Sequence, residues 1–116
     1  MDRGLHFVMV AAAIVLDVAL YVIVARSATG KAARGVALGI RTKATQASEK
    51  AWLAAHVTAY PIVRDTALVN AALMIVSLFV PIEFQLYVVQ LALGALVIGI
   101  IFAYVQANKS AKATHG

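Results

Sequence analysis

The chain has 116 residues, of which 63% are hydrophobic, with a net charge of +5 and no cysteine. Soluble domains average about 45–50% apolar residues, so this composition indicates a single membrane domain. The lack of cysteine excludes disulfides and thiolate metal sites. The basic residues lie between apolar stretches and are not interleaved with stacking aromatic side chains, so they indicate membrane topology and not nucleic-acid binding.

The first apolar stretch covers residues 5–26. It is long enough to cross a hydrocarbon core about 30 Å thick as a helix. A signal peptide is the competing interpretation, but Asp17 interrupts the stretch, little positive charge precedes it, and no small-residue cleavage pattern follows it. We therefore predict a retained transmembrane helix.

Residues 27–60 depart from the apolar pattern, and their first half is rich in glycine and basic residues. Arg or Lys at a helix centre costs about 2.5–3.5 kcal/mol on insertion into a membrane. Residues 39–56 mix cations, hydroxyls, an acid, an indole and an imidazole, so they cannot cross a lipid core. We expect this segment to lie at the membrane surface, where its varied chemistry is available for recognition.

A short amphipathic helix is predicted within the second half of this segment. Ser48 or Thr45 can supply the N-cap oxygen, and Glu49 then falls in the first turn, where its charge favours the helix dipole. Apolar and aromatic residues recur at helical spacing. They are Trp52, Leu53, His56, Val57 and Tyr60. Pro61 removes a backbone donor and is expected to kink or break the chain, so the helix should lie in the membrane interface and end there.

Two more apolar stretches, residues 62–80 and 84–106, are long enough to span a membrane and meet at a turn beginning with Pro81. Arg64 can extend its guanidinium back to the surface. The tail from Asn108 is short, polar and basic, and is expected to fray. The predicted fold is therefore all-α: an integral membrane domain with three transmembrane helices and a short amphipathic interfacial helix between the first and second.

The basic residues also predict orientation. Nine of the ten Lys and Arg residues lie in the segment 26–50, at Arg64 or in the tail, whereas Arg3 lies at the other end. Positively charged loops stay in the cytoplasm. This rule places the basic segment and the C-terminus inside, with the N-terminus and the Glu83 turn outside.

Among the polar side chains of the predicted spans, Asp17, Asn70 and Gln90 are candidates for a role inside the membrane. Asp17 and Asn70 lie at similar depth, about 16–18 Å from the outer ends of their helices at 1.5 Å per residue, and can face each other. A carboxyl group in lipid should point into the bundle. A helix–helix hydrogen bond and a proton-linked or ligand-binding site both remain open at this point.

The third span carries small residues at intervals of four, which let another helix approach closely. These residues are Ala95, Gly99, Ala103 and Ala107. The partner helix is left open: it can belong to this chain, to a second copy in a homo-oligomer, or to a different protein.

The polar residues of the surface segment follow a distinctive spacing. It is Gly39-x-Arg41-Thr42-x-x-Thr45-x-x-Ser48-Glu49-x-x-Trp52-x-x-x-His56. This pattern resembles the signature of the SdpI family, bacterial membrane proteins named for immunity to a secreted sporulation-delaying toxin. Two positions differ from it, with Lys43 in place of a usual Pro and Val57 in place of a frequent basic residue. The resemblance implies a multi-pass protein of the bacterial inner membrane that acts in toxin immunity or membrane-linked signalling.

Within this motif, Arg41 suits a lipid phosphate or a carboxylate such as Glu49 or Asp65. The hydroxyls of Thr42, Thr45 and Ser48 suit turns and caps, and Trp52 suits an anchor in the headgroup region. His56 can be pH-sensitive or bind a ligand. With no second histidine nearby, a metal site is not expected.

The sequence contains no nucleophile–base pair and no catalytic carboxylate pair, so we expect neither an enzyme nor a cofactor. The favoured function is recognition of a protein or lipid partner through the cytoplasmic motif. The alternative is an accessory subunit packed into a larger membrane complex. A small proton-coupled transporter using Asp17 is disfavoured because compact exporters of that kind have four spans.

Overall fold

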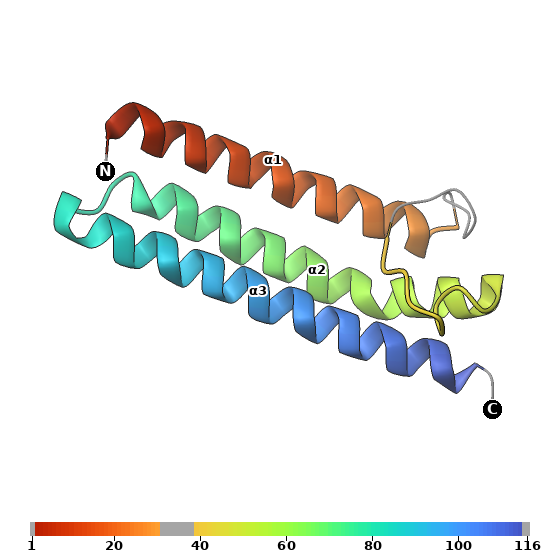
Figure 1. Ribbon diagram of the computed structural model, residues 1–116. Helices are drawn as coiled ribbons and strands as arrows, with labels where there is room; N and C mark the ends of the chain where they lie inside the picture. Colours follow the sequence, from red (N-terminus) through yellow and green to blue (C-terminus); the bar gives the residue numbers. More distant parts are fainter. Residues whose placement is uncertain (1, 31–38, 115–116) are drawn as a thin grey trace.

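The computed structural model describes residues 2–30 and 39–114, and this part of the chain forms three α-helices. They are α1 (Arg3–Ala28), α2 (Glu49–Ser77) and α3 (Ile82–Ala113), shown in Figure 1. All three are long and apolar enough to cross a membrane. The all-helical fold with three potential spans is therefore confirmed.

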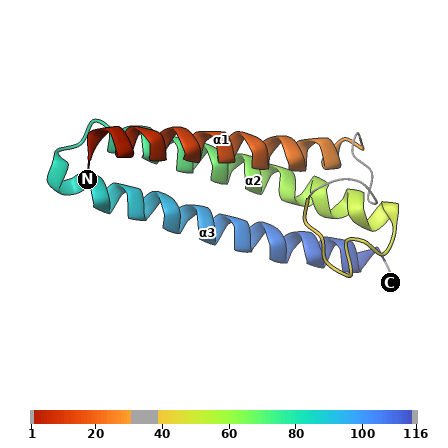
Figure 2. The same cartoon turned by 45° about the horizontal axis from the view of Figure 1, so that its top comes forward.

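Helix α2 lies between the other two helices, as Figures 1 and 2 show. It packs against both α1 and α3, whereas the Cα atoms of α1 and α3 stay more than 8 Å apart. The described part of the chain measures 53 × 22 × 18 Å. The end of α1, the start of α2 and the end of α3 meet at one end of this elongated bundle, which we call the motif end.

The predicted interfacial helix is not a separate element. Helix α2 begins at Glu49 and continues through Pro61 to Ser77, and its first turns run at an angle to the remainder in Figure 1. Proline removes one backbone hydrogen bond and bends a helix without having to end it. The helix continues because the buried side chains on either side of the proline share one core cluster with α3. On α2 they are Ala51, Ala55, Ala59 and Val63.

The polar tail is also helical where it was expected to fray. Helix α3 extends to Ala113, well beyond the predicted end of the span. The buried residues Ala103, Ala107 and Ala111 follow one another at intervals of four and pack in the same cluster as the alanines of α2. Burial of this stripe holds the last turns of α3 in place.

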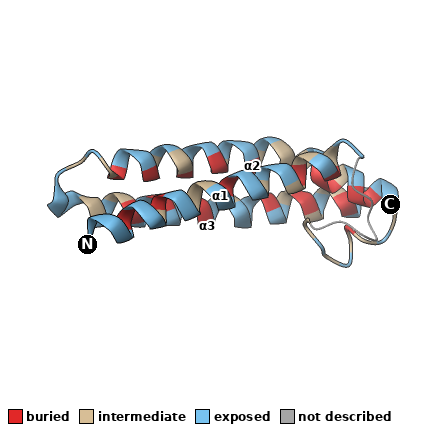
Figure 3. Ribbon diagram, turned by 90° about the horizontal axis from the view of Figure 1, so that it is seen from above, coloured by how far each residue is buried: buried red, intermediate tan, exposed pale blue. Residues whose placement is uncertain are grey.

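The contact between α2 and α3 is built from small residues. A Cβ atom placed on Gly99 would overlap the side chain of Thr66, lying 2.8 Å from its Cβ. The small-residue stripe of α3 therefore lies against the chain's own second helix at Gly99, Ala103 and Ala107, while Ala95 is half-buried. Figure 3 shows the buried positions along the facing sides of the helices and the exposed positions outside.

Candidate functional site

Two threonines close the loop that precedes α2. The Thr45 side chain is fully buried, and its Oγ1 donates to the carbonyl oxygen of Ile40 at 2.8 Å and accepts the N–H of Thr42 at 2.8 Å. Thr42 Oγ1 in turn accepts the N–H of Thr45 at 3.1 Å and donates to Oδ1 of Asn108 on α3 at 2.7 Å. These bonds satisfy the backbone of the loop and attach it to the far end of the chain.

His56 attaches the same loop to α2. Its Nε2 accepts the N–H of Ile40 at 2.9 Å, so the ring proton must be on Nδ1, which donates to the Trp52 carbonyl at 2.7 Å. The imidazole is fully buried and both of its nitrogens are engaged. Within the described residues no group of three potential ligands could hold a metal ion. The geometry therefore assigns His56 a positioning role in its neutral form.

Gly39 and Trp52 both pack against this histidine. Trp52 is only 2% exposed, and its ring centroid lies 4.2 Å from that of His56. Gly39 has φ = 155°, and a Cβ there would lie 2.6 Å from His56 Nε2 and 3.1 Å from the indole. The expectation that Trp52 anchors the chain in the headgroup region is therefore wrong, because the indole packs inside the protein against the loop.

Arg41 lies on the outside of this folded loop. Its Nη2 donates to Oε1 of Gln46 at 2.9 Å, and its Cζ lies 5.8 Å from the centroid of the Trp52 ring. Asp65, one of the acids considered as its partner, is instead paired with Arg64 at 3.0 Å. Arg41 therefore covers the indole and presents an exposed guanidinium at the surface of the loop.

Of the two N-cap candidates, Ser48 caps α2, and its Oγ accepts the N–H of Ala51 at 3.0 Å. Glu49 lies exposed in the first turn. With these two residues placed, the structure brings the seven motif residues together in one unit. Thr42, Thr45, Trp52 and His56 hold the loop, while Arg41 and Glu49 lie at its surface.

Sequence reasoning missed the part of the site contributed by α3. Thr58 Oγ1 donates to Ser110 Oγ at 2.8 Å, and Asn108 holds Thr42 as described above. Both α3 residues fall in the stretch expected to fray. The alanines at positions 103, 107 and 111 continue a helical period through that stretch, and this signal could have extended the helix to the polar residues between them.

The motif end of the molecule is strongly basic at its surface. Among the residues that the structure describes, six exposed cations lie on the parts of α1, the loop, α2 and α3 that meet there (Figure 1). They are Arg26, Arg41, Lys43, Lys50, Lys109 and Lys112. The buried polar groups of the motif thus shape the loop, and the exposed cations surround it.

Asp17, Asn70 and Gln90 are not hydrogen-bonded to one another in the part of the chain that the structure describes. Asn70 is fully buried and donates from Nδ2 to the Ala92 carbonyl of α3 at 3.0 Å. Asp17 is also buried, but within the described residues neither of its carboxyl oxygens has a hydrogen-bond partner. Gln90 is exposed on the outer side of α3. The helix–helix hydrogen bond considered for Asp17 and Asn70 is therefore not formed.

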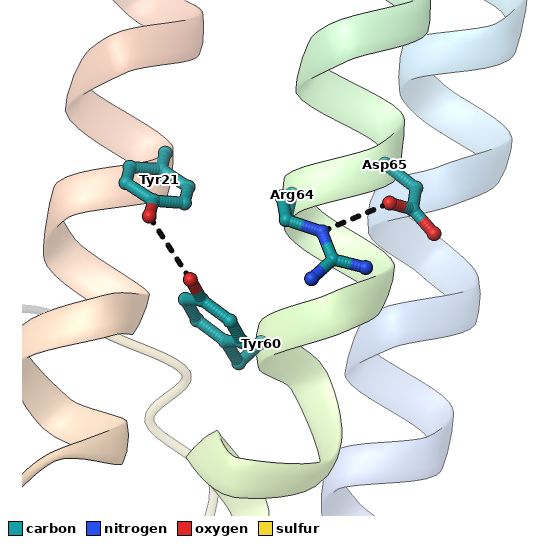
Figure 4. A network of polar contacts seen from close by, with 4 residues as sticks. All are labelled: Tyr21, Tyr60, Arg64 and Asp65. Atoms are coloured by element: carbon teal, nitrogen blue, oxygen red, sulfur yellow. Dashed lines mark hydrogen bonds and ion pairs between the residues drawn. The ribbon is translucent and has the colours of Figure 1, made fainter.

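A separate polar network joins α1 to α2, as Figure 4 shows. The hydroxyls of Tyr21 and Tyr60 are 2.9 Å apart. Arg64 lies with its Cζ 5.8 Å from the centroid of the Tyr60 ring and donates from Nε to Oδ1 of Asp65 at 3.0 Å. The network thus satisfies its own members, and Arg64 is compensated by Asp65.

Compared with known protein families, the chain matches one family model. Residues 32–105, more than half of the chain, match the model of the SdpI/YfhL protein family. The matched range contains the folded loop, all of α2 and most of α3. No curated protein and no solved structure matches the chain.

Proposed function

This chain belongs to the SdpI/YfhL protein family, and on that basis we propose that it is a non-enzymatic membrane protein that recognises a partner through its motif end. The observation that carries the proposal is the division of roles within the motif. Two threonine hydroxyls and a buried imidazole hold the loop in one shape, and exposed cations surround that loop. A preformed surface loses little conformational entropy on binding.

We further propose an orientation and a compartment. The positive-inside rule places the motif end in the cytoplasm, with the N-terminus and the Glu83 turn outside. Family membership supports the inner membrane of a bacterium. The natural partner is then an acidic surface on the cytoplasmic side, and toxin immunity or signalling is the form of activity that the family resemblance suggests.

Cysteine labelling tests the orientation, because the chain has no cysteine of its own. Cysteines are introduced singly at Lys43 and Glu83, and intact cells are treated with a membrane-impermeant thiol reagent. We expect labelling at position 83 and none at position 43 until the cells are opened. The reverse pattern would contradict the proposed orientation.

Purification at natural expression levels tests partner recognition. We expect a stoichiometric partner to be recovered with the wild-type chain and lost from the Lys109→Glu, Lys112→Glu double variant, because charge reversal repels an acidic surface. Arg3→Glu is the matched control, since it reverses a charge at the opposite end. Equal recovery from all three proteins would show that the basic end does not bind the partner.

A second candidate function is that of an accessory subunit within a larger membrane complex. It is favoured by Gln90, an exposed amide in an apolar helix, where lipid offers no hydrogen-bond partner and a neighbouring helix does. If this function holds, Gln90→Leu removes the co-purifying protein while the double charge reversal leaves it in place. The two variants therefore distinguish the two functions.

A further inference from the structure

A groove of about 400 Å³ lies between α1 and α2, away from the motif end's folded loop. Its walls are apolar, with Ile14 and Val18 contributed by α1 and Leu68 and Ala71 by α2. Val18 is 56% exposed and Leu68 is 63% exposed, so the groove opens on the side of the bundle. Its volume falls in the range of about 300–1,000 Å³ that is common for small-molecule sites.

The groove contains one carboxyl group that its surroundings do not satisfy. Asp17 lines the groove and is 4% exposed, and neither Oδ1 nor Oδ2 has a hydrogen-bond partner in the part of the chain that the structure describes. A buried carboxylate without a donor is costly in an apolar environment, and more so within a membrane. A ligand that supplies a charged donor would remove this cost.

The neighbouring polar residues are already occupied. Arg64 lines the same groove, but its Nε donates to Asp65 and its guanidinium lies over Tyr60. Tyr21, also in the wall, shares a hydrogen bond with Tyr60. Figure 4 shows both pairs, Tyr21 with Tyr60 and Arg64 with Asp65. None of these side chains bonds to Asp17, so its carboxyl group can accept a donor from outside.

We propose that this groove binds an organic amine with an apolar body. The ammonium group pairs with the Asp17 carboxylate, and the apolar part lies between Val18 and Leu68. A metal ion is a poorer match, because the described residues include no group of three potential metal ligands. The site is independent of the partner recognition proposed for the motif end.

A fluorinated phenethylamine is a suitable probe, and the alcohol of the same skeleton is its neutral counterpart. The full chain is placed in phosphatidylcholine nanodiscs, and binding is followed by fluorine NMR with empty nanodiscs as the baseline for partitioning. We expect saturable binding of the amine to the wild type. The alcohol should bind about tenfold more weakly or worse, because it lacks the charge-assisted bond.

Three variants make the test specific. Asp17→Asn should weaken amine binding about tenfold or more, whereas Glu83→Gln, which removes a carboxylate from the distant turn, should leave it unchanged. Ala71→Leu keeps the carboxylate and fills the groove, so it should also weaken binding. This variant tests the site without changing Asp17, in case Asp17→Asn fails to fold. Equal affinity of wild type and Asp17→Asn, equal binding of the alcohol, or no saturable binding to the wild type would overturn the proposal.

The amine can be a free molecule or the headgroup of an amino lipid. Repeating the titration in nanodiscs that contain phosphatidylethanolamine separates these two sources. A fall in the apparent affinity identifies the lipid ammonium as the competing occupant, and an unchanged affinity identifies a free amine. Either result is compatible with the site only if the Asp17→Asn variant has lost the binding seen in the wild type.

Discussion

The two faces of α2 pack in different ways. Toward α3, small residues bring the helices so close that Gly99 has no room for a side chain, and the buried Asn70 donates to an α3 carbonyl. Toward α1, a groove of about 400 Å³ remains, and the buried Asp17 has no partner within the described residues. The difference indicates that α2, α3 and the folded loop form one tightly packed unit, against which α1 packs less closely.

The family match follows the same division. It starts at residue 32, after α1, and covers the loop, α2 and most of α3. The closely packed unit and the matched segment are therefore nearly the same part of the chain. The following substitutions test whether the unit has the rigidity that its contacts imply.

The largest effect is expected from Gly99→Leu. Its Cβ would overlap the Thr66 side chain, so the helices must separate, and the free energy of unfolding should fall by about 3 kcal/mol or more. Gly94→Leu is the matched control on the same helix, because nothing lies within 4 Å of a Cβ there. Chemical denaturation in detergent measures both variants. Equal stability of the two would show that α2 and α3 are not in close contact.

Gly39→Ala should have the next largest effect. The new Cβ would collide with His56 and Trp52, and φ at this position is 155°. We expect a loss of about 2–3 kcal/mol in the stability of the loop, from strain and displaced contacts. Gly30→Ala also places an alanine at positive φ, but with nothing within 4 Å, so it should cost about 1–2 kcal/mol. A larger loss at Gly30 than at Gly39 would contradict the packing described here.

Thr45→Val tests the hydrogen bonds of the loop with little change in shape. The substitution leaves the Thr42 N–H and the Ile40 carbonyl without their buried partner, which should cost about 1–3 kcal/mol. Thr29→Val is the control, because that hydroxyl is exposed at the end of α1 and bonds its own helix. Thr29→Val should change the free energy of unfolding by less than about 0.5 kcal/mol. Thermal unfolding of the two variants decides the comparison.

Arg41 should give the smallest effect. Its guanidinium bonds Gln46 and lies over the Trp52 ring, but at an exposed site such contacts contribute only about 0.5–1 kcal/mol. Lysine does not reproduce a planar contact, so Arg41→Lys should weaken the loop almost as much as Arg41→Ala. The exposed Lys43 provides the reference, and Lys43→Ala should do little. Full retention of loop stability in Arg41→Lys would show that the planar group is not needed.

Most of the architecture could be predicted from the sequence, because long apolar stretches specify membrane helices through length alone. The helix end expected at Pro61 and the fraying expected after Asn108 were both wrong, and for the same reason. Each was judged from local propensity, whereas buried residues at intervals of four continue the packing past both points, to Val63 on α2 and to Ala111 on α3. Tertiary contacts overrode the local signal.

The candidate site was only partly predictable. The motif residues could be selected by their spacing, and the cap at Ser48 followed from local rules. The roles of Trp52 and His56 depend on a loop that folds back over them and brings Gly39 into contact. Such a contact between residues far apart in sequence leaves no local periodic signal, so the indole could not be distinguished from a membrane anchor.

Hydrogen exchange over the loop tests the central claim, namely that residues 39–48 are folded against α2 and α3. In nanodiscs, the amides of Ile40 and Thr42 should be protected in the wild type and in Lys43→Ala, because they donate to His56 Nε2 and Thr45 Oγ1. Thr45→Val should lose that protection. Rapid exchange of both amides in the wild type, or the same protection in Thr45→Val, would show that the segment is not held by these bonds.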